Sequence, residues 1–229
     1  MPDTYLSSFL KFLADKKNKD DSRLPSLSEL SKTTGTSIPT LREQLEVARA
    51  FGFVEVKPKT GIRKNKYRFT PAVTASLAYA VMEDQSRFDM YADLRKHLED
   101  SYFVEAATRL TPEDIHSLRS LIEQARLKLS RKPIVIPFYE HRDFHLLMYS
   151  RLNNPFVTGL LEAYWQMYEE AGLNRYTDIS YQQKVWEYHE KIVETIQQGE
   201  YSSSRKALLE HMILLQQRSD KPVAKNHFE

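Results

Sequence analysis

Residues 24–45, which read LPSLSELSKTTGTSIPTLREQL, decide the fold of the N-terminal part of this 229-residue chain. Ser26 and Glu29 have the spacing of a capping box, in which each side chain can bond the other residue's exposed backbone amide. The helix that they begin is predicted to end at Gly35, because glycine adopts the left-handed conformation of a C-cap without strain. Ser37 can cap the next helix. Two short helices joined by a tight turn that contains glycine predict a helix-turn-helix.

A further helix precedes this pair and a basic hairpin follows it. Between Tyr5 and Leu13, apolar residues recur at helical spacing. Residues 53–57 alternate as a strand, residues 58–61 supply a turn, and residues 62–69 return as a second strand rich in Lys and Arg. Such a wing beside a recognition helix would bind DNA phosphates. The alternative is an ordinary hairpin with a solvated cationic face.

Residues 24–45 resemble the LPSxxxLAxxxGVSRxTVREAL signature of the GntR family of transcriptional regulators. The resemblance continues through residues 51–54 to the wing glycine, Gly61, and so covers about the first 65 residues. It implies a winged helix-turn-helix that binds double-stranded operator DNA. Two positions that usually hold arginine in FadR-like members are occupied here by Ser28 and Ile38, so the usual operator sequence of that family is not implied.

The resemblance also implies which side chains contact DNA. The arginine matched by Arg42 projects from the recognition helix into the major groove, where a guanidinium can donate two hydrogen bonds to guanine. The alternative role of Arg42 is a surface ion pair with Glu46, four residues later. The residues predicted to contact DNA are Ser37, Thr40, Arg42, Lys59, Gly61, Arg63 and Lys64.

The rest of the chain has a helical pattern. We predict a DNA-binding domain over residues 1–70, a linker with a short helix over 71–86, a helical domain over 87–219 and a tail over 220–229. Thr111 followed by Pro112 is a strong helix start. Further helices are predicted at about 134–152, 156–172, 179–198 and 202–218, with breaks at residues 153–155, Gly172 and Gly199. The predicted fold is mainly α, with an N-terminal winged helix-turn-helix and a C-terminal all-α helical bundle.

Composition and charge agree with a DNA-binding protein of the cytoplasm. Residues 1–70 carry 14 Lys and Arg against 8 Asp and Glu, whereas the remainder carries 19 against 23. A basic N-terminal third on an acidic body indicates that this end meets a polyanion. The chain has no cysteine, which excludes disulfides and thiolate metal sites. No apolar run approaches the roughly 20 residues of a membrane span, and no secretory signal is recognisable.

The helical part resembles the FCD ligand domain of FadR-type GntR regulators over about residues 87–218. Arg95 and Glu99, an Asn-Pro break after a Phe-His helix, and two late histidines carry this resemblance. Metal-binding members of the group place Asp-x-x-x-His on one helix and single histidines on two later helices. The positions that match are His141, which replaces the aspartate, and His145, His189 and His211.

The chemistry of these four histidines can be argued from spacing. His141 and His145 are four residues apart on one helix, so both imidazoles can reach one ion, and His189 and His211 can join them in a bundle core. Neutral imidazoles suit Zn²⁺ or Ni²⁺. Glu140 or Asp143 is a candidate for an additional carboxylate ligand. The alternative is that the four are separate core or surface histidines and that the protein senses its ligand without a metal.

Arg95 matches the arginine that pairs with an effector carboxylate in this family, a task that suits the planar guanidinium. Its alternative role is an ion pair with Glu99, which is compatible with ligand binding. Eight aromatic residues are candidates either to line a ligand pocket or to fill the core: Tyr139, Tyr149, Tyr164, Trp165, Tyr168, Tyr181, Trp186 and Tyr188.

Two other classes of protein fit the sequence less well. A histidine–metal enzyme would activate water on the ion, but the chain contains no His-Glu-x-x-His motif. A helical interaction adaptor would not need a basic wing. We therefore expect a homodimeric, non-enzymatic regulator that binds a pseudo-palindromic operator. Its affinity for DNA is expected to change when a small carboxylate effector binds in the helical domain.

Overall fold

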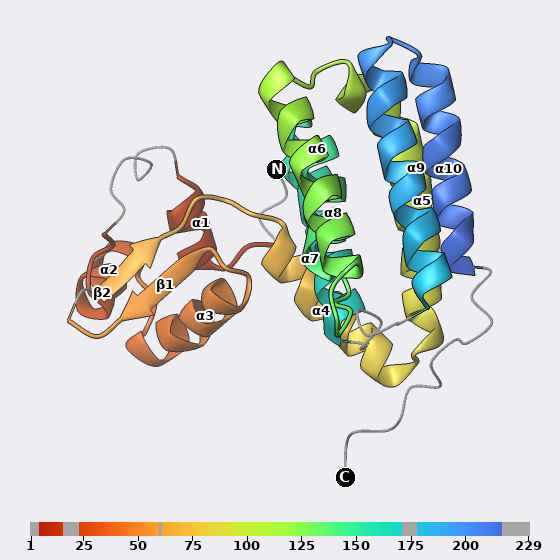
Figure 1. Ribbon diagram of the computed structural model, residues 1–229. Coiled ribbons are helices and arrows are strands. Elements are labelled where there is room, and N and C mark those ends of the chain that lie inside the picture. The colour runs from red at the N-terminus through yellow and green to blue at the C-terminus, as the bar shows by residue number, and fades with distance from the viewer. Residues whose placement is uncertain (1–4, 16–22, 60, 171–177, 217–229) are drawn as a thin grey trace. The chain divides into compact units, whose positions relative to one another are not determined.

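A computed structural model describes residues 5–15, 23–59, 61–170 and 178–216, and it divides the chain into two compact units, residues 1–75 and 76–229 (Figure 1). Helices predominate in both units, which confirms the predicted mainly α fold. Among the described residues, no helix combines the length and apolar character that crossing a bilayer requires.

The N-terminal unit is a winged helix-turn-helix, and its local signals act as predicted. Ser26 and Glu29 form a complete capping box, Gly35 ends the helix at a φ of 68°, and Ser37 caps the recognition helix. These contacts span three or four residues, so the local sequence is enough to specify them. The elements are α1 (Ser8–Ala14), α2 (Leu27–Thr34), α3 (Ile38–Ala50), β1 (Val54–Lys57) and β2 (Gly61–Lys64).

The wing is a short antiparallel hairpin in which Val56 lies opposite Ile62. Its second strand ends at Lys64, so the prediction that it extends through Phe69 was wrong. Asn65 follows the strand in the same register: its backbone amide donates to the carbonyl of Phe53, and its side-chain amide donates to the carbonyl of Gly52, at 2.9 and 3.0 Å.

The segment that follows the wing is a continuous helix, α4 (Thr70–Glu83), which is longer than the short helix predicted within the linker. Residues 72–83 contain neither glycine nor proline and include four alanines, so nothing in their sequence interrupts a helix. Pro71 lies in the first turn, where its missing N–H removes no helical hydrogen bond. The division between the two compact units falls within this helix, after Ala75.

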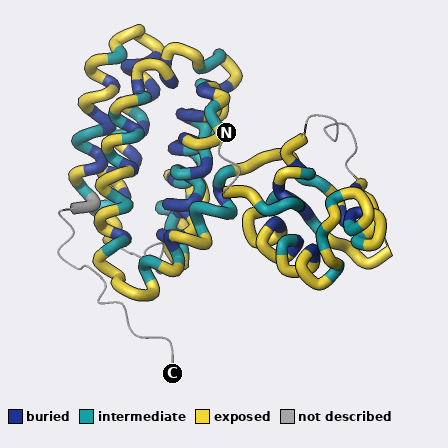
Figure 2. The backbone as a smooth tube through the Cα atoms, turned by 180° about the vertical axis from the view of Figure 1, so that it is seen from behind, coloured by how far each residue is buried: buried dark blue, intermediate teal, exposed yellow. Residues whose placement is uncertain are grey.

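Six helices of the C-terminal unit pack in a closed ring, in the order α5, α10, α9, α6, α7, α8 and back to α5 (Figures 1 and 2). Their buried residues face inward and their exposed residues face outward. Such a ring encloses one core to which every helix contributes a stripe. The bounds are α5 (Ser86–Ala107), α6 (Pro112–Leu129), α7 (Phe138–Met148), a 3-10 turn (Ser150–Leu152), α8 (Pro155–Glu170), α9 (Ile179–Gln197) and α10 (Tyr201–Gln216).

The predicted helices of this unit are present, with one shifted boundary. Helix α7 begins at Phe138 and not near residue 134, because Pro137 disfavours helical conformation in the residue before it. Asn153 adopts a left-handed conformation and ends the 3-10 turn, and Gly199 adopts the same conformation before α10 begins. The predicted break at Gly172 and the tail over residues 220–229 lie outside the described residues.

The start of α6 carries a capping box that also binds an arginine from another part of the ring. The Asp114 carboxylate accepts hydrogen bonds from the Thr111 backbone amide at 2.9 Å and from the Arg151 guanidinium at 2.7 and 2.9 Å. These donors, Arg151 first, lower the pKa of Asp114 to about 2. Because the folded state binds a proton on Asp114 less readily than the unfolded state does, Asp114 stabilises the fold above about pH 4.

We therefore predict that Asp114→Asn lowers the free energy of unfolding of the helical domain by about 1 kcal/mol at pH 7, the usual value of a helix cap. The difference between variant and parent shrinks as the pH falls from 4 towards 2. Denaturant unfolding at several pH values measures it. The control is Glu123→Gln, which changes an exposed carboxylate on the same helix. A loss that is the same at every pH would contradict the assignment to the Asp114 carboxylate.

Candidate metal centre and nucleic-acid interface

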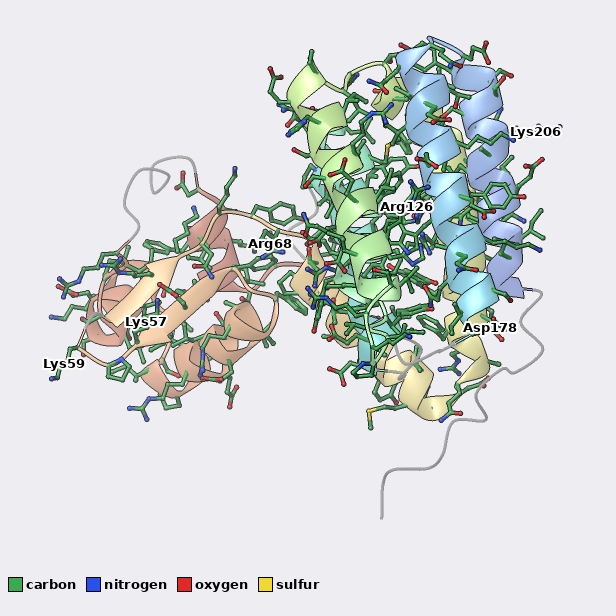
Figure 3. The ribbon with its side chains drawn as sticks, in the orientation of Figure 1. Lys57, Lys59, Arg68, Arg126, Asp178 and Lys206 are labelled. Carbon is green, nitrogen blue, oxygen red and sulfur yellow. The ribbon has the colours of Figure 1, made fainter. Side chains whose placement is uncertain are left out.

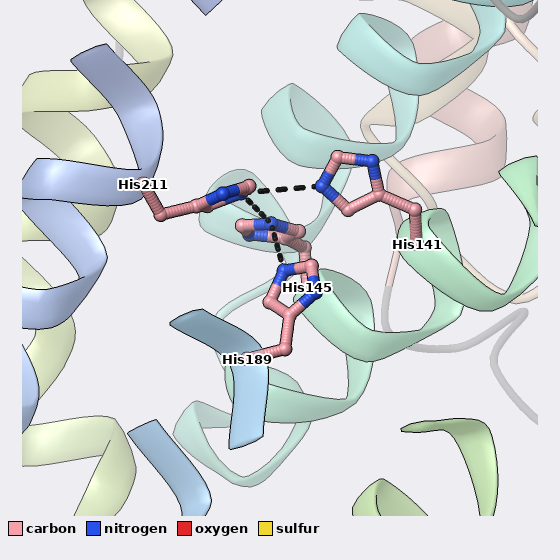
Figure 4. Close-up of side chains that lie close together, drawn as sticks. All are labelled: His141, His145, His189 and His211. Atoms are coloured by element: carbon pink, nitrogen blue, oxygen red, sulfur yellow. Dashed lines mark hydrogen bonds between the residues drawn. The ribbon is translucent and has the colours of Figure 1, made fainter. Parts of the chain in front are cut away.

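The four predicted histidines meet inside the helical ring (Figure 4). His141 and His145 lie one turn apart on α7, His189 comes from α9 and His211 from α10. The Nε2 atom of His211 lies 3.2 Å from those of His141 and His145, and the Nε2 atoms of His145 and His189 are 3.3 Å apart. All four candidate ligand atoms lie within 4.8 Å of one another. The structure thus brings together residues that are up to 70 positions apart in the sequence.

These imidazoles are buried and uncharged. The exposed fraction is 8% for His141 and zero for the other three. Burial lowers the pKa of His141, His189 and His211 well below the usual value, and the neighbouring imidazoles and Arg95 lower it further. Burial also lowers the pKa of His145, although the nearby Glu99 carboxylate opposes this shift. Neutral histidine is the form that binds a metal ion.

Behind the histidines, a buried carboxylate joins α5 to α7. The Glu99 side chain pairs with Arg95 on its own helix at 2.5 Å and contacts Nδ1 of His145 at 2.7 Å. Burial alone would raise the pKa of Glu99, but Arg95 and His145 together hold it below its usual value, so the carboxylate is ionised. His145 must then donate its Nδ1 proton to Glu99, which leaves the Nε2 lone pair directed at the other imidazoles.

Arg95 is fully engaged in this network. Burial opposes its charge, but Glu99 and Tyr164 raise the pKa of the guanidinium above its usual value. The guanidinium carbon lies 4.3 Å from the ring centre of Tyr164 and 4.7 Å from that of Trp165, a cation–π arrangement. The predicted ion pair with Glu99 is therefore present. The hollow against Arg95, lined also by Leu94 and Leu161, has no room for a water molecule.

Aromatic rings pack directly against the imidazoles. The ring centre of Phe144 lies 4.2 Å from that of His189, Trp186 lies 4.7 Å from His189, and Trp165 lies 4.9 Å from His141. Of the eight candidate aromatic residues, five are buried in the core: Tyr149, Tyr164, Trp165, Tyr168 and Trp186. Tyr139 is half exposed, and Tyr181 and Tyr188 are intermediate. The centre is therefore enclosed by packed rings.

The two other candidate carboxylates point elsewhere. Glu140 pairs with Lys128 on α6 at 2.6 Å, and Asp143 pairs with its neighbour Arg142 at 2.8 Å. Neither belongs to the group of potential ligands. The donor set is thus four neutral imidazole nitrogens, which fits a borderline divalent cation such as Zn²⁺ or Ni²⁺. Such an ion would act as a Lewis acid and would cross-link α7, α9 and α10, the three helices that carry these histidines.

The recognition helix presents its predicted DNA-contacting side chains to solvent. Ser37, Thr40 and Arg42 are all exposed in its first turns. The Ser37 hydroxyl accepts from the Thr40 backbone amide at 3.3 Å, so it also holds the end of the helix in place. Glu46 is paired with Arg49 at 2.8 Å, and the alternative pair between Arg42 and Glu46 is not formed.

The wing supplies a second basic element on the same unit. Lys59 lies in the hairpin turn and is exposed (Figure 3), and so are Gly61 and Arg63 on β2. Lys64 differs from the others, because its ammonium group donates to the carbonyl of Leu13 and so ties the wing to α1.

One residue that positions the recognition helix was missed by sequence reasoning. The Gln44 side-chain oxygen accepts from the Ser8 hydroxyl at 3.1 Å and from the Phe9 backbone amide at 3.0 Å. These bonds join α3 to the start of α1. No local motif announces them, because the partners lie 35 and 36 residues away.

Together the two units define the class as winged-helix regulators with a C-terminal helical domain. The profile of the FCD domain matches residues 90–214, more than half of the chain, and the chain therefore belongs to the FCD-domain family. This confirms the resemblance that Arg95, Glu99 and the histidines suggested. No curated protein sequence matches the chain.

One solved structure supports the same fold, and two others are similar to a lesser degree. The chain is similar to Streptococcus agalactiae GntR, with a TM-score of 0.66 and 18% identity over 90% of this chain and 94% of that one. It is also similar to E. coli McbR/YncC, with a TM-score of 0.49 and 22% identity over 93% and 99% of the two chains. A GntR family member from Pseudomonas syringae scores 0.44 at 20% identity over 84% and 73%. The first match shows that the predicted combination of winged helix and helical domain is correct.

The buried network makes a prediction for stability. Arg95→Met would leave the ionised Glu99 carboxylate buried with only His145 as a partner, so we expect a loss of about 3–5 kcal/mol in the free energy of unfolding. Arg109→Met is the matched control, because Arg109, just beyond the end of α5, makes an exposed i,i+4 pair with Glu105 and should cost at most about 1 kcal/mol. Denaturant unfolding of the metal-free protein measures both. Equal losses would show that Arg95 does not compensate a buried charge.

Proposed function

We propose that this protein is a transcriptional regulator of the cytoplasm whose winged helix-turn-helix binds operator DNA and whose FCD domain controls that binding through a ligand at the histidine centre. As a homodimer, it would place two recognition helices in successive major grooves of a pseudo-palindromic site. The observation that carries the proposal is the pairing of two features in one chain: a solvent-exposed basic recognition surface and a buried, preorganised ligand set.

The recognition surface combines the two kinds of contact that specific DNA binding needs. Arg42 is exposed on α3 with no competing ion pair to Glu46, and it can donate to the N7 and O6 atoms of guanine. Lys59 and Arg63 on the wing can neutralise phosphates. The N-terminal end of α3, with the hydroxyls of Ser37 and Thr40, adds a backbone site for a further phosphate.

The proposed control by a ligand depends on the four imidazoles. Bound Zn²⁺ or Ni²⁺ at His141, His145, His189 and His211 would join α7, α9 and α10. A carboxylate effector at Arg95 remains a prediction of the family resemblance. Such an effector would have to compete with Glu99, which already holds the guanidinium. Any ligand that controls DNA binding must bind two conformations of the protein unequally.

For DNA binding, we predict that Arg42→Ala weakens binding by about 1–3 kcal/mol to a duplex selected by the parent protein from a random library, and relaxes its sequence preference at one base pair. Lys59→Ala should weaken all sequences equally and reduce the salt dependence by about one ion. The control is Arg49→Ala, which removes an exposed charge already paired with Glu46. Unchanged affinity of Arg42→Ala would exclude its role in base recognition.

For the metal, we predict about one divalent ion per chain in the purified protein, measured by elemental mass spectrometry. The double variant His145→Ala/His189→Ala should contain none, because it lacks half of the ligands. His116→Ala, which removes an exposed histidine of α6, should retain the metal. A parent protein that contains no metal and takes up neither Zn²⁺ nor Ni²⁺ would exclude the metal centre and favour a regulator that does not depend on a metal.

A further inference from the structure

The four imidazole rings lie close to the corners of a tetrahedron. The six distances between their ring centres range only from 4.5 to 5.3 Å. A square arrangement would make two of the six roughly 40% longer than the other four. Three of the six Nε2 separations, at 3.2–3.3 Å, agree with the edge of about 3.3–3.4 Å that a tetrahedron has when metal–nitrogen bonds are about 2.0–2.1 Å, and all four candidate ligand atoms lie within 4.8 Å of one another.

Four imidazoles in this arrangement complete a coordination shell. Zn²⁺ prefers four ligands in a tetrahedron, and a zinc site that must also bind another molecule keeps one position open. Here His141 supplies the fourth imidazole, and the rings of Phe144, Trp165 and Trp186 pack around the four histidines. A Zn²⁺ ion bound by all four would have no tetrahedral position left for an effector carboxylate.

The same ligand set carries no negative charge. Four neutral imidazoles add no negative charge to a divalent cation, and the guanidinium of Arg95 lies 3.1 Å from Nδ1 of His145. The Nδ1 atoms of His189 and His211 are buried and have no hydrogen-bond partner among the described residues. Glu99 therefore brings negative charge to the centre through a single imidazole, that of His145.

Glu99 is consequently shared between the guanidinium of Arg95 and the imidazole of His145. It pairs with Arg95 within α5 and bonds His145 on α7. A metal at Nε2 of His145 makes the Nδ1 proton more acidic and strengthens its bond to the carboxylate. Occupancy of the centre would thus draw Glu99 towards α7, at the expense of its pair with Arg95 on α5. Helix α5 follows directly on α4, the helix that leads out of the DNA-binding unit.

We propose that Zn²⁺ itself is the regulatory ligand, bound in a closed tetrahedral site of four histidines, and that Glu99 is the positioning residue that transmits its occupancy from His145 to Arg95 on α5. This inference rests on the proposed function, because it names the ligand of the same centre. It requires no organic effector.

The coordination is tested first, without DNA. Full-length protein stripped with a chelator is titrated with Co²⁺, whose visible absorption is intense in a tetrahedral site and weak in an octahedral one. We expect the intense spectrum at one equivalent and its loss when Zn²⁺ is added. A weak spectrum, or one that changes when acetate or citrate is added, would overturn the closed site.

The regulation is tested next, with a duplex selected by the parent protein from a random library in both metal-free and zinc-loaded forms. We expect zinc alone to change the affinity for this duplex at least tenfold. Tetrahedral zinc with unchanged affinity would overturn the regulatory role and leave the proposed DNA binding intact. Failure of both forms to select any duplex would instead overturn the proposed function, whatever the cobalt spectrum shows.

Glu99 is tested by variants with opposite expected effects on zinc affinity, measured by competition with a chromophoric chelator. Glu99→Gln should keep the tetrahedral cobalt spectrum, bind zinc about 10–100-fold more weakly and lose most of the zinc response in DNA binding. Arg95→Met, which removes a competing cation, should bind zinc more tightly. The matched control is Glu105→Gln, which breaks an exposed i,i+4 pair on the same helix and should behave as the parent. If Arg95→Met bound zinc no more tightly than Glu105→Gln, the role of Glu99 would be overturned, even if Glu99→Gln failed to fold.

Discussion

The helical domain depends on one buried carboxylate. Glu99 has no exposed surface, yet it stays ionised because Arg95 and His145 bond it from two helices. A lone carboxylate in this position would be very unfavourable, so the three groups must occur together. Their arrangement fixes which nitrogen of His145 carries the proton, and that choice directs the other nitrogen at His141, His189 and His211.

The rest of the ring is built to tolerate this polar centre. Imidazoles can bind a divalent cation and also be buried without charge, and here burial itself keeps them neutral. Aromatic rings surround them with apolar surface. The result is a core whose histidine cluster, with Arg95 and Glu99, touches five of the six helices of the ring: α5, α7, α8, α9 and α10. A ligand bound at that cluster would act on most of the domain at once.

The DNA-binding unit differs from the helical domain, because it is organised by local signals and not by a buried polar centre. Its helices begin and end at short local signals, the capping box of Ser26 and Glu29, the turn at Gly35 and the cap at Ser37. The charged side chains predicted to contact DNA stay exposed, and one lysine of the wing, Lys64, is used for internal support. In the proposed function, specificity for DNA would reside on this exposed surface and control in the buried centre.

The sequence by itself determined the features that depend on neighbours three or four residues apart. The helix caps, the turn of the helix-turn-helix, the Arg95–Glu99 pair and the common face of His141 and His145 all follow from the geometry of a single helix or turn. The joining of four histidines was predicted through a family resemblance, since spacing alone does not bring separate helices together. Only the tertiary structure decided that Glu99 bonds His145, that Gln44 holds α1 and that the imidazoles form a tetrahedron. These contacts join residues 35 or more positions apart, and the packing of whole helices, not a local preference, sets their distances.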